Sequence, residues 1–362
     1  MKKYIKVFTV ILVSTLLGMV ISRSTMADCK TGNGNNTAAA KPATEDQKLV
    51  KENQEITDNT YYISAKQAHQ LIEQNPQTAI LAVAYGKYPN FNKGHIPGAI
   101  QMSTNEVESQ KNHWNILPAS QLRKNFLKKG ITADTPVIFY SNDISAASRV
   151  AFAAYWLGVK NIKIIDGGQQ AWTRAGYKLQ NGKEAKVKAQ SNFGNNTVAH
   201  PEALIKTPKE LLAAESANPN LVLVSTRSWK EYLGNISGYS YIKETGEVKG
   251  AVYGRISKSS SDVAYLTNGD GTIKNPTAEL EYWKKKGIVP DKEVVFYCGT
   301  GWRACVPFFI VKEEGFQNVK IYDGGWYDWN ISHKANPEKF PVQKGEPGTS
   351  NFRIEKGTVA ER

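Results

Sequence analysis

Short runs of wholly apolar residues recur along the chain and alternate with longer stretches that have a helical spacing of apolar positions. Such runs are typical of strands buried on both faces. Amphipathic stretches over 118–129, 146–156 and 304–314 lie among them and predict helices. The alternation predicts an α/β fold in which helices cover both faces of a mainly parallel sheet. The apolar runs are AILAV (79–83), VIFY (137–140), IKII (162–165), LVLV (221–224), VVFY (294–297) and VKIY (319–322).

The chain also repeats itself at an offset of 157 residues. Three pairs of segments have this offset. A fourth pair lies upstream of them in both copies, and its offset differs by a few residues. One match could arise by chance, but four in one order indicate a duplicated domain. The pairs are KKGITAD (128–134) with KKGIVPD (285–291), VIFYS (137–141) with VVFYC (294–298), GVKNIKIIDGGQQAW (158–172) with GFQNVKIYDGGWYDW (315–329), and GHIPGAI (94–100) with GEVKGAV (246–252).

The N-terminal stretch has the pattern of a secretory signal peptide. Lysines at positions 2, 3 and 6 precede an uncharged, mostly apolar run, and Thr25 and Ala27 are small residues at the positions that signal peptidase reads. The run is short for a membrane span, so an uncleaved anchor is the weaker interpretation. Asp28 stands where a lipoprotein would need a small residue before Cys29, which disfavours lipidation. We therefore expect a bacterial protein that is periplasmic or otherwise exported, without a stable membrane span after cleavage.

These patterns divide the chain into six parts. After cleavage 335 residues remain, more than one hydrophobic core usually serves. We predict a signal peptide (1–27), a flexible polar leader (28–59), domain 1 (60–180), a linker (181–203), domain 2 (204–345) and a tail (346–362).

Charge narrows the range of partners. The formal net charge of +13 becomes +9 after cleavage, because residues 1–27 hold four basic residues and no acid. A basic exported protein favours anionic partners. Lysines and arginines do not cluster with interleaved aromatic residues, so nucleic acid is disfavoured. The five histidines are scattered without the spacing of metal ligands, which predicts no metal site.

Three cysteines, Cys29, Cys298 and Cys305, do not make a disulfide framework. Cys298 follows the apolar run VVFY and opens the loop Cys298-Gly299-Thr300-Gly301-Trp302-Arg303 before a predicted helix. We expect Gly299 and Gly301 to permit positive φ, so that backbone N–H groups turn inward and bind an anion. The same N–H groups and Arg303 favour a thiolate at Cys298. The sequence thus predicts an activated sulfur nucleophile that faces an anionic substrate.

A free cysteine after a strand is more often a small buried apolar residue than a nucleophile. The other copy argues against that interpretation, since its loop SNDISAASR has Ser141 in place of Cys298 and lacks the glycines and the nearby arginine. We interpret domain 1 as non-catalytic. Only four residues separate Cys298 from Arg303, whereas cysteine phosphatases and arsenate reductases have a longer loop for a tetrahedral oxyanion. The shorter loop favours one transferred sulfur atom on Cys298.

GHIPGA, YCGTGWRA and YDGGWYDW resemble the rhodanese superfamily, in particular exported multi-domain thiosulfate sulfurtransferases with a CGTGWR loop. The resemblance covers roughly residues 61–332, and TRSWKEYLGNISGYSYIKETGEVKGA (226–251) adds to it. It implies two tandem rhodanese-like domains and no metal or organic cofactor. The implied partners are a small anionic sulfur donor and an acceptor that is cyanide or a thiol.

The resemblance also implies a mechanism. The Cys298 thiolate takes the sulfane sulfur of thiosulfate, and the N–H groups of Gly299 to Arg303 stabilise the persulfide. Arg303 is implied to bind the sulfonate of the donor. Arg227 matches the arginine of an Asp-x-Arg motif near the substrate pocket and is implied to bind substrate, although Ser225 replaces the acid of the motif. Donor 3-mercaptopyruvate and a non-catalytic persulfide carrier remain alternatives. Copy two has Glu247 where copy one has the family histidine, His95.

Several other residues have two interpretations each. Cys305 is expected to be a buried helix residue too far from Cys298 for a disulfide, with a resolving thiol as the minor alternative. Trp302 is expected either to gate the pocket or to pack against domain 1. Asp323 and Trp329 match Asp166 and Trp172 and are expected to be structural. His113 is a candidate for the domain interface.

Overall fold

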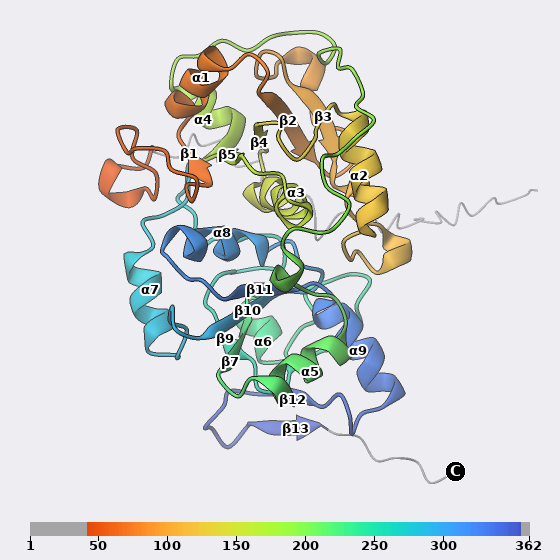
Figure 1. Ribbon diagram of the computed structural model, residues 1–362. Coiled ribbons are helices and arrows are strands. Elements are labelled where there is room, and N and C mark those ends of the chain that lie inside the picture. The colour runs from red at the N-terminus through yellow and green to blue at the C-terminus, as the bar shows by residue number, and fades with distance from the viewer. Residues whose placement is uncertain (1–41, 356–362) are drawn as a thin grey trace, which may run out of the picture.

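The computed structural model describes residues 42–355, which form two domains of the same topology stacked on one another (Figure 1). Domain 1 contains a parallel sheet of order β1-β5-β4-β2-β3, and domain 2 contains a parallel sheet of order β6-β11-β10-β7-β9. Each strand has its counterpart at the same place in the other sheet. The predicted duplication and the α/β fold are therefore confirmed.

The elements of domain 1 alternate as the apolar runs indicated. Its strands are β1 (Tyr62–Ile63), β2 (Ala79–Ala84), β3 (Ile100–Ser103), β4 (Val137–Tyr140) and β5 (Ile162–Ile165). Its α-helices are α1 (Ala65–Gln74), α2 (Ala119–Lys128), α3 (Ile144–Leu157) and α4 (Gly168–Arg174).

Domain 2 repeats this order and adds a small antiparallel sheet. Its parallel strands are β6 (Leu204–Ile205), β7 (Leu221–Ser225), β9 (Val252–Tyr253), β10 (Glu293–Tyr297) and β11 (Val319–Tyr322). Its α-helices are α5 (Pro208–Ala217), α6 (Trp229–Tyr232), α7 (Thr277–Lys284), α8 (Cys305–Glu313) and α9 (Gly325–Ala335). The added sheet has the order β13-β12-β8 and consists of β8 (Glu247–Val248), β12 (Val342–Lys344) and β13 (Arg353–Glu355).

The two domains meet along α3 and α8, which lie between the two sheets in Figure 1. Both helices are apolar on nearly all sides because each is buried between its own sheet and the other domain. Phe152 of α3 packs edge-on against Phe308 of α8, with ring centroids 4.9 Å apart. The helix that follows the cysteine loop is thus part of the domain interface. Within residues 42–355, no helix is long and apolar enough to cross a membrane.

The ends of the described chain differ from the prediction. Part of the expected flexible leader packs on domain 2, since Leu49 N–H donates to Ile273 O at 3.0 Å and Ala43 N–H donates to the Asp270 carboxylate at 3.1 Å. Val50 is buried there, so a short apolar segment offsets the cost of ordering this polar stretch. The expected tail contains β13, which pairs with β12 in an antiparallel hairpin. Cys29 and the predicted signal peptide lie outside the described residues.

A buried carboxyl at the interface makes stability depend on pH. Glu313 of α8 accepts the N–H groups of Tyr61 and Tyr62 at 2.5 and 2.7 Å. Burial raises the pKa of Glu313 from 4.5 to about 8, although these two N–H groups oppose the rise. Between these pH values the folded chain holds a proton that the unfolded chain has lost, so stability falls as the pH rises.

We expect Glu313→Gln to remove this pH dependence, because the neutral amide can still accept the two N–H bonds. In urea unfolding, we compare the free energy of unfolding of the variant with that of the wild type at each pH. This difference should favour the variant by roughly 1–3 kcal/mol more at about pH 9 than at about pH 5. The exposed Glu281→Gln serves as the control. Equal pH dependence in wild type and Glu313→Gln would show that the carboxyl is ionised in the folded chain.

Candidate active site

Cys298 stands at the carboxyl end of β10, and α8 begins seven residues later at Cys305. β10 lies between β11 and β7 in the sheet, at the edge where ligands of parallel α/β sheets bind. Two N–H groups from the start of α9 hold the first carbonyls of the loop. Trp326 N–H donates to Cys298 O at 2.8 Å, and Tyr327 N–H donates to Gly299 O at 3.1 Å. The loop is therefore fixed by the next βα unit.

The two loop glycines meet different requirements. Gly301 has φ +84°, as the sequence predicts. Gly299 does not have a positive φ, so that prediction is wrong for it. A Cβ on Gly299 would lie 2.2 Å from Cζ of Tyr239, and glycine is needed here because an aromatic ring covers the backbone.

Tyr239 is a site residue that the sequence reasoning missed. Its hydroxyl accepts the Gly299 N–H at 2.8 Å and also bonds the Arg303 guanidinium. Cys298 is only 2 % exposed beneath this cover. The available signal was the segment 234–246, rich in Gly, Ser and Tyr, between the arginine of copy two and its GEVKGA motif. Such a segment has no helical or strand pattern, and only its return onto the loop reveals what it does.

Arg303 is clamped within the protein. Its two terminal nitrogens donate to the two oxygens of Glu231 at 3.0 Å each, and one of them also donates to Ser259 O at 2.8 Å. Burial disfavours the charged guanidinium, but Glu231, Tyr239 and Cys298 outweigh burial and raise the pKa of Arg303 well above its ordinary value. Arg303 is thus a permanent cation beside Cys298. Direct binding of a sulfonate by Arg303 stays a prediction.

Arg227 has a carboxylate partner, although its Asp-x-Arg motif lacks the acid. It is fully buried, and its Nη1 lies 3.4 Å from Oε2 of Glu247. Ser225 stands in place of the expected acid, and its hydroxyl donates to the same carboxylate at 2.7 Å. The Tyr297 hydroxyl also donates to this carboxylate. Glu247, at the position of the family histidine, therefore supplies the missing carboxylate. Sequence spacing could not reveal this because the acid comes from β8.

Thr300 contributes a buried polar atom without a partner. Its hydroxyl has no hydrogen bond to any described residue, although the side chain is fully buried. A buried hydroxyl of this kind costs free energy unless a ligand satisfies it. The position of Thr300, two residues after Cys298, makes a substrate the natural partner.

Three further predicted residues, Trp302, Cys305 and His113, lie near the loop or at the domain interface. Trp302 packs against domain 1, where its indole N–H donates to the two oxygens of Glu108 at 2.7 and 2.9 Å, so the packing alternative holds. The Cys305 thiol donates to Gly301 O at 3.2 Å, and burial raises its pKa, which favours packing over redox chemistry. Cys305 is the first residue of α8 and is buried, as expected of a helix residue, and both thiols are free. His113 reaches the interface and lies 2.6 Å from Asp328.

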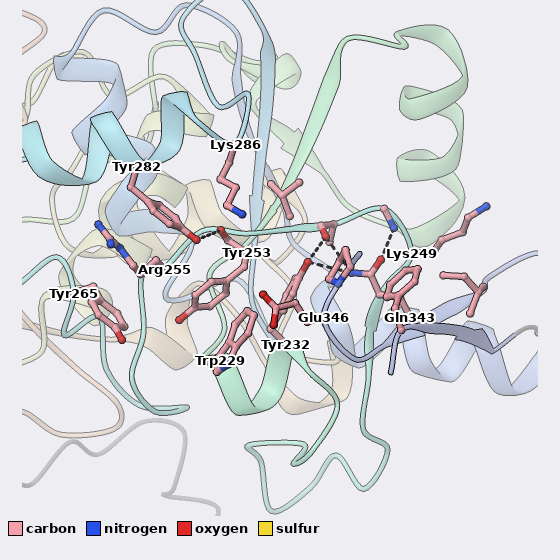
Figure 2. Close-up of a pocket in the computed structure, with 16 residues that line it drawn as sticks. Trp229, Tyr232, Lys249, Tyr253, Arg255, Tyr265, Tyr282, Lys286, Gln343 and Glu346 are labelled. Carbon is pink, nitrogen blue, oxygen red and sulfur yellow. Dashed lines mark hydrogen bonds between the residues drawn. The ribbon is translucent and has the colours of Figure 1, made fainter. Parts of the chain in front are cut away.

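A cavity of about 720 Å³ lies elsewhere in domain 2, between α6, α7 and the β12–β13 hairpin. Figure 2 shows its aromatic walls, including Tyr282, whose ring faces the Arg255 guanidinium at 4.0 Å. Trp229 and Tyr232 of α6 line this cavity, whereas Glu231 between them faces Arg303. None of residues 298–303 lines it, so this cavity is separate from the cysteine loop.

Comparison with protein families accounts for both copies. The model of the rhodanese-like domain matches residues 64–175 and 207–332. The chain belongs to the rhodanese-like domain family. Both matches fall within the predicted domains, and the second includes Cys298 and its loop.

Two named relatives match most of this chain. The chain is 40% identical over 276 residues to the thiosulfate sulfurtransferase YnjE of Escherichia coli K12, a match that covers 76% of this chain and spans 61% of that protein. It is 29% identical over 262 residues to a putative thiosulfate sulfurtransferase of Saccharopolyspora erythraea, covering 70% of this chain and 88% of the relative.

Solved structures also match the fold of this chain. The crystal structure of YnjE matches with a TM-score of 0.73 and 37% identity, covering 81% of this chain and 70% of that one. Structures of EanB, including a cysteine persulfide with ergothioneine, match with a TM-score of 0.73 and 28% identity, covering 80% and 71%.

Glu231 holds both site arginines, and its loss should destabilise domain 2. Burial opposes its charge, but Arg303 and Arg227 lower the pKa of Glu231 to about 2. Glu231→Gln leaves two buried guanidinium groups without this carboxylate, and we expect a loss of about 3–5 kcal/mol in urea unfolding at neutral pH. Glu281→Gln, on the exposed side of α7, should lose less than about 0.5 kcal/mol. Similar unfolding midpoints for the two variants would contradict the buried clamp.

Proposed function

We propose that this protein is a thiosulfate sulfurtransferase that carries the sulfur on Cys298. The observation that carries the proposal is a buried cysteine at the head of a glycine-containing loop, separated by four residues from an arginine that cannot lose its charge. The names of the E. coli and S. erythraea relatives support the same activity.

The reaction follows from the geometry of the loop. The Cys298 thiolate attacks the outer sulfur of thiosulfate, the S–S bond breaks, and sulfite leaves with the bonding electrons. The persulfide charge then lies close to Arg303, and Thr300 offers a hydroxyl without a protein partner. Cyanide or a thiolate next attacks the outer sulfur and restores Cys298. Cys298 is buried and the Tyr239 ring lies against the neighbouring Gly299, so we expect the Tyr239 ring to move when the donor binds.

Turnover of thiosulfate and cyanide to thiocyanate tests this proposal. We expect activity in the wild type, at most background activity in Cys298→Ser, and near wild-type activity in Cys305→Ser, which is the matched control. After treatment with thiosulfate, the intact mass should rise by one sulfur atom in the wild type and Cys305→Ser only.

The alternatives have distinct outcomes in the same experiments. Added sulfur on Cys298 without turnover would identify a persulfide carrier. Turnover with 3-mercaptopyruvate but not with thiosulfate would identify 3-mercaptopyruvate as the sulfur donor. Hydrolysis of an aryl phosphate without any added sulfur would contradict sulfur transfer and identify a phosphatase.

A second acceptor is favoured by one specific observation. The EanB structures include hercynine and ergothioneine complexes, with substitutions at a tyrosine 59 positions before, and a threonine two positions after, the cysteine that carries the persulfide. Tyr239 and Thr300 stand at the same intervals from Cys298. We propose an imidazole betaine as a candidate acceptor, whose ring C–H is replaced by a bond to the outer persulfide sulfur while Cys298 leaves as a thiol.

Tyr239→Phe separates the two acceptors. Transfer from thiosulfate to cyanide needs no proton, so we expect turnover within about threefold of the wild type. Transfer into an imidazole removes a ring proton, so ergothioneine formation from hercynine should fall at least about tenfold. Tyr241→Phe, on the same segment, is the control. Absence of ergothioneine with persulfide-loaded wild type would exclude this acceptor.

We also propose export to the periplasm, on the basis of the basic start, apolar run and small residues within 1–27. Cell fractionation and N-terminal sequencing of the mature protein test it. A protein that retains residues 1–27 in the cytoplasmic fraction would contradict it.

A further inference from the structure

The cysteine loop touches domain 1 through Trp302. Its indole N–H donates to Glu108, and both side chains are almost completely buried, with exposed fractions of 3% and 0%. Glu108 belongs to the domain that lacks the thiol. A residue of the catalytic loop is therefore held by a carboxylate from the other copy.

Arg149 of α3 continues this contact beneath the loop. Its Nε donates to Glu108 Oε2 at 3.1 Å, and its Nη1 lies 2.7 Å from Asp323 Oδ1 at the end of β11. Its Nη2 donates to Trp114 O at 3.0 Å. All three charged side chains are buried. One guanidinium therefore joins a carboxylate of domain 1 to a carboxylate of domain 2.

The guanidinium lies directly against the loop backbone. A Cβ on Gly301 would be 2.5 Å from Arg149 Nη1 and 2.7 Å from Asp323 Oδ1. Gly301 thus has two reasons to be glycine: its positive φ, and the close approach of an ion pair. Arg149 therefore packs closely against the backbone between Cys298 and Arg303, where a shift of its guanidinium can change the shape of the loop.

The duplication supplies an internal comparison. Asp323 and Asp166 are counterparts, and each accepts an N–H from the other domain: Ile116 donates to Asp323 at 2.6 Å and Ile273 to Asp166 at 2.7 Å. The arginine breaks this symmetry, because the repeat places Val306 at the position of Arg149. Within residues 42–355, the Asp-Gly-Gly turn of domain 2 receives a guanidinium from the other domain, and that of domain 1 does not.

Ion pairs of this kind contribute little to stability on balance, since apolar side chains of similar volume often stabilise a buried site as well or better. We propose that Glu108 and Arg149 of domain 1 are positioning residues, which hold the Cys298 loop in its reactive geometry through Trp302 and Gly301. The proposal rests on the proposed sulfurtransferase function. It gives the copy without a thiol a direct part in the chemistry of the other copy.

Arg149→Met and Glu108→Gln test this role. For each variant, the rate of persulfide formation from thiosulfate is followed by rapid quench and intact mass, together with kcat and KM. We expect kcat and the rate of persulfide formation to fall about 10–100-fold with little change in KM, the size typical of residues that orient a reacting group. Arg149→Lys keeps the charge without the planar fork and should recover part of the rate.

Arg174→Met is the matched control, because Arg174 also joins the two domains, through Asp270 O at 3.1 Å, but does not contact the loop. It should stay within about twofold of the wild type. Wild-type rates in folded Arg149→Met and Glu108→Gln would overturn the proposal. If Arg149→Met and Glu108→Gln both unfold while Arg174→Met stays folded, the proposal is also overturned, because the pair then serves to stabilise the fold.

Alkylation of Cys298 by iodoacetamide separates this proposal from the proposed function. Wild type that forms no persulfide would refute thiosulfate as donor, whereas the alkylation rate still reports the loop geometry. We expect that rate to change at least about threefold in Arg149→Met and to stay unchanged in Arg174→Met. Equal alkylation rates in the wild type and Arg149→Met would count against positioning, whatever the donor.

Discussion

The site depends on burying positive charge beside a cysteine, and one carboxylate makes that possible. Glu231 meets Arg303 with two bonds and also contacts Arg227 at 3.5 Å, with all three side chains buried. Without it, the buried Arg303 guanidinium would lose its carboxylate partner, and the buried Arg227 guanidinium would keep only Glu247. Its place on the short α6, capped by Ser228, fixes the position of both arginines. The cysteine therefore faces a cation whose charge and position are set before any substrate arrives.

The two copies have diverged while keeping the same scaffold. Strand order, the Asp-Gly-Gly turns and the reciprocal aspartate contacts are common to both. In domain 1, Asp143 places its own carboxylate at the start of α3 and accepts Ser145 N–H at 2.9 Å, where domain 2 has the cysteine loop. A negative side chain there fills the position that an anionic substrate would need. Domain 1 has kept the architecture of a site, and its interface contacts reach the loop of domain 2.

Much of the fold could be predicted, because fully apolar strand runs and a fixed repeat are local patterns. The parallel α/β class, the duplication and the position of Cys298 at a strand end followed from them. The partners of Arg227, Gly299 and Trp302 could not, since each comes from a segment distant in sequence: Glu247, Tyr239 and Glu108. The leader was expected to be flexible because it is polar, yet in its described part Leu49 N–H donates to Ile273 O and Val50 is buried.

A crystal of the protein soaked in thiosulfate would show whether Cys298 carries the sulfur. We expect one additional sulfur atom bonded to Sγ of Cys298, close to Thr300, with the Tyr239 hydroxyl displaced from Gly299 N–H. Cys305 should stay unmodified. An unchanged Cys298 thiol under Tyr239, or sulfur added only to Cys305, would contradict this expectation.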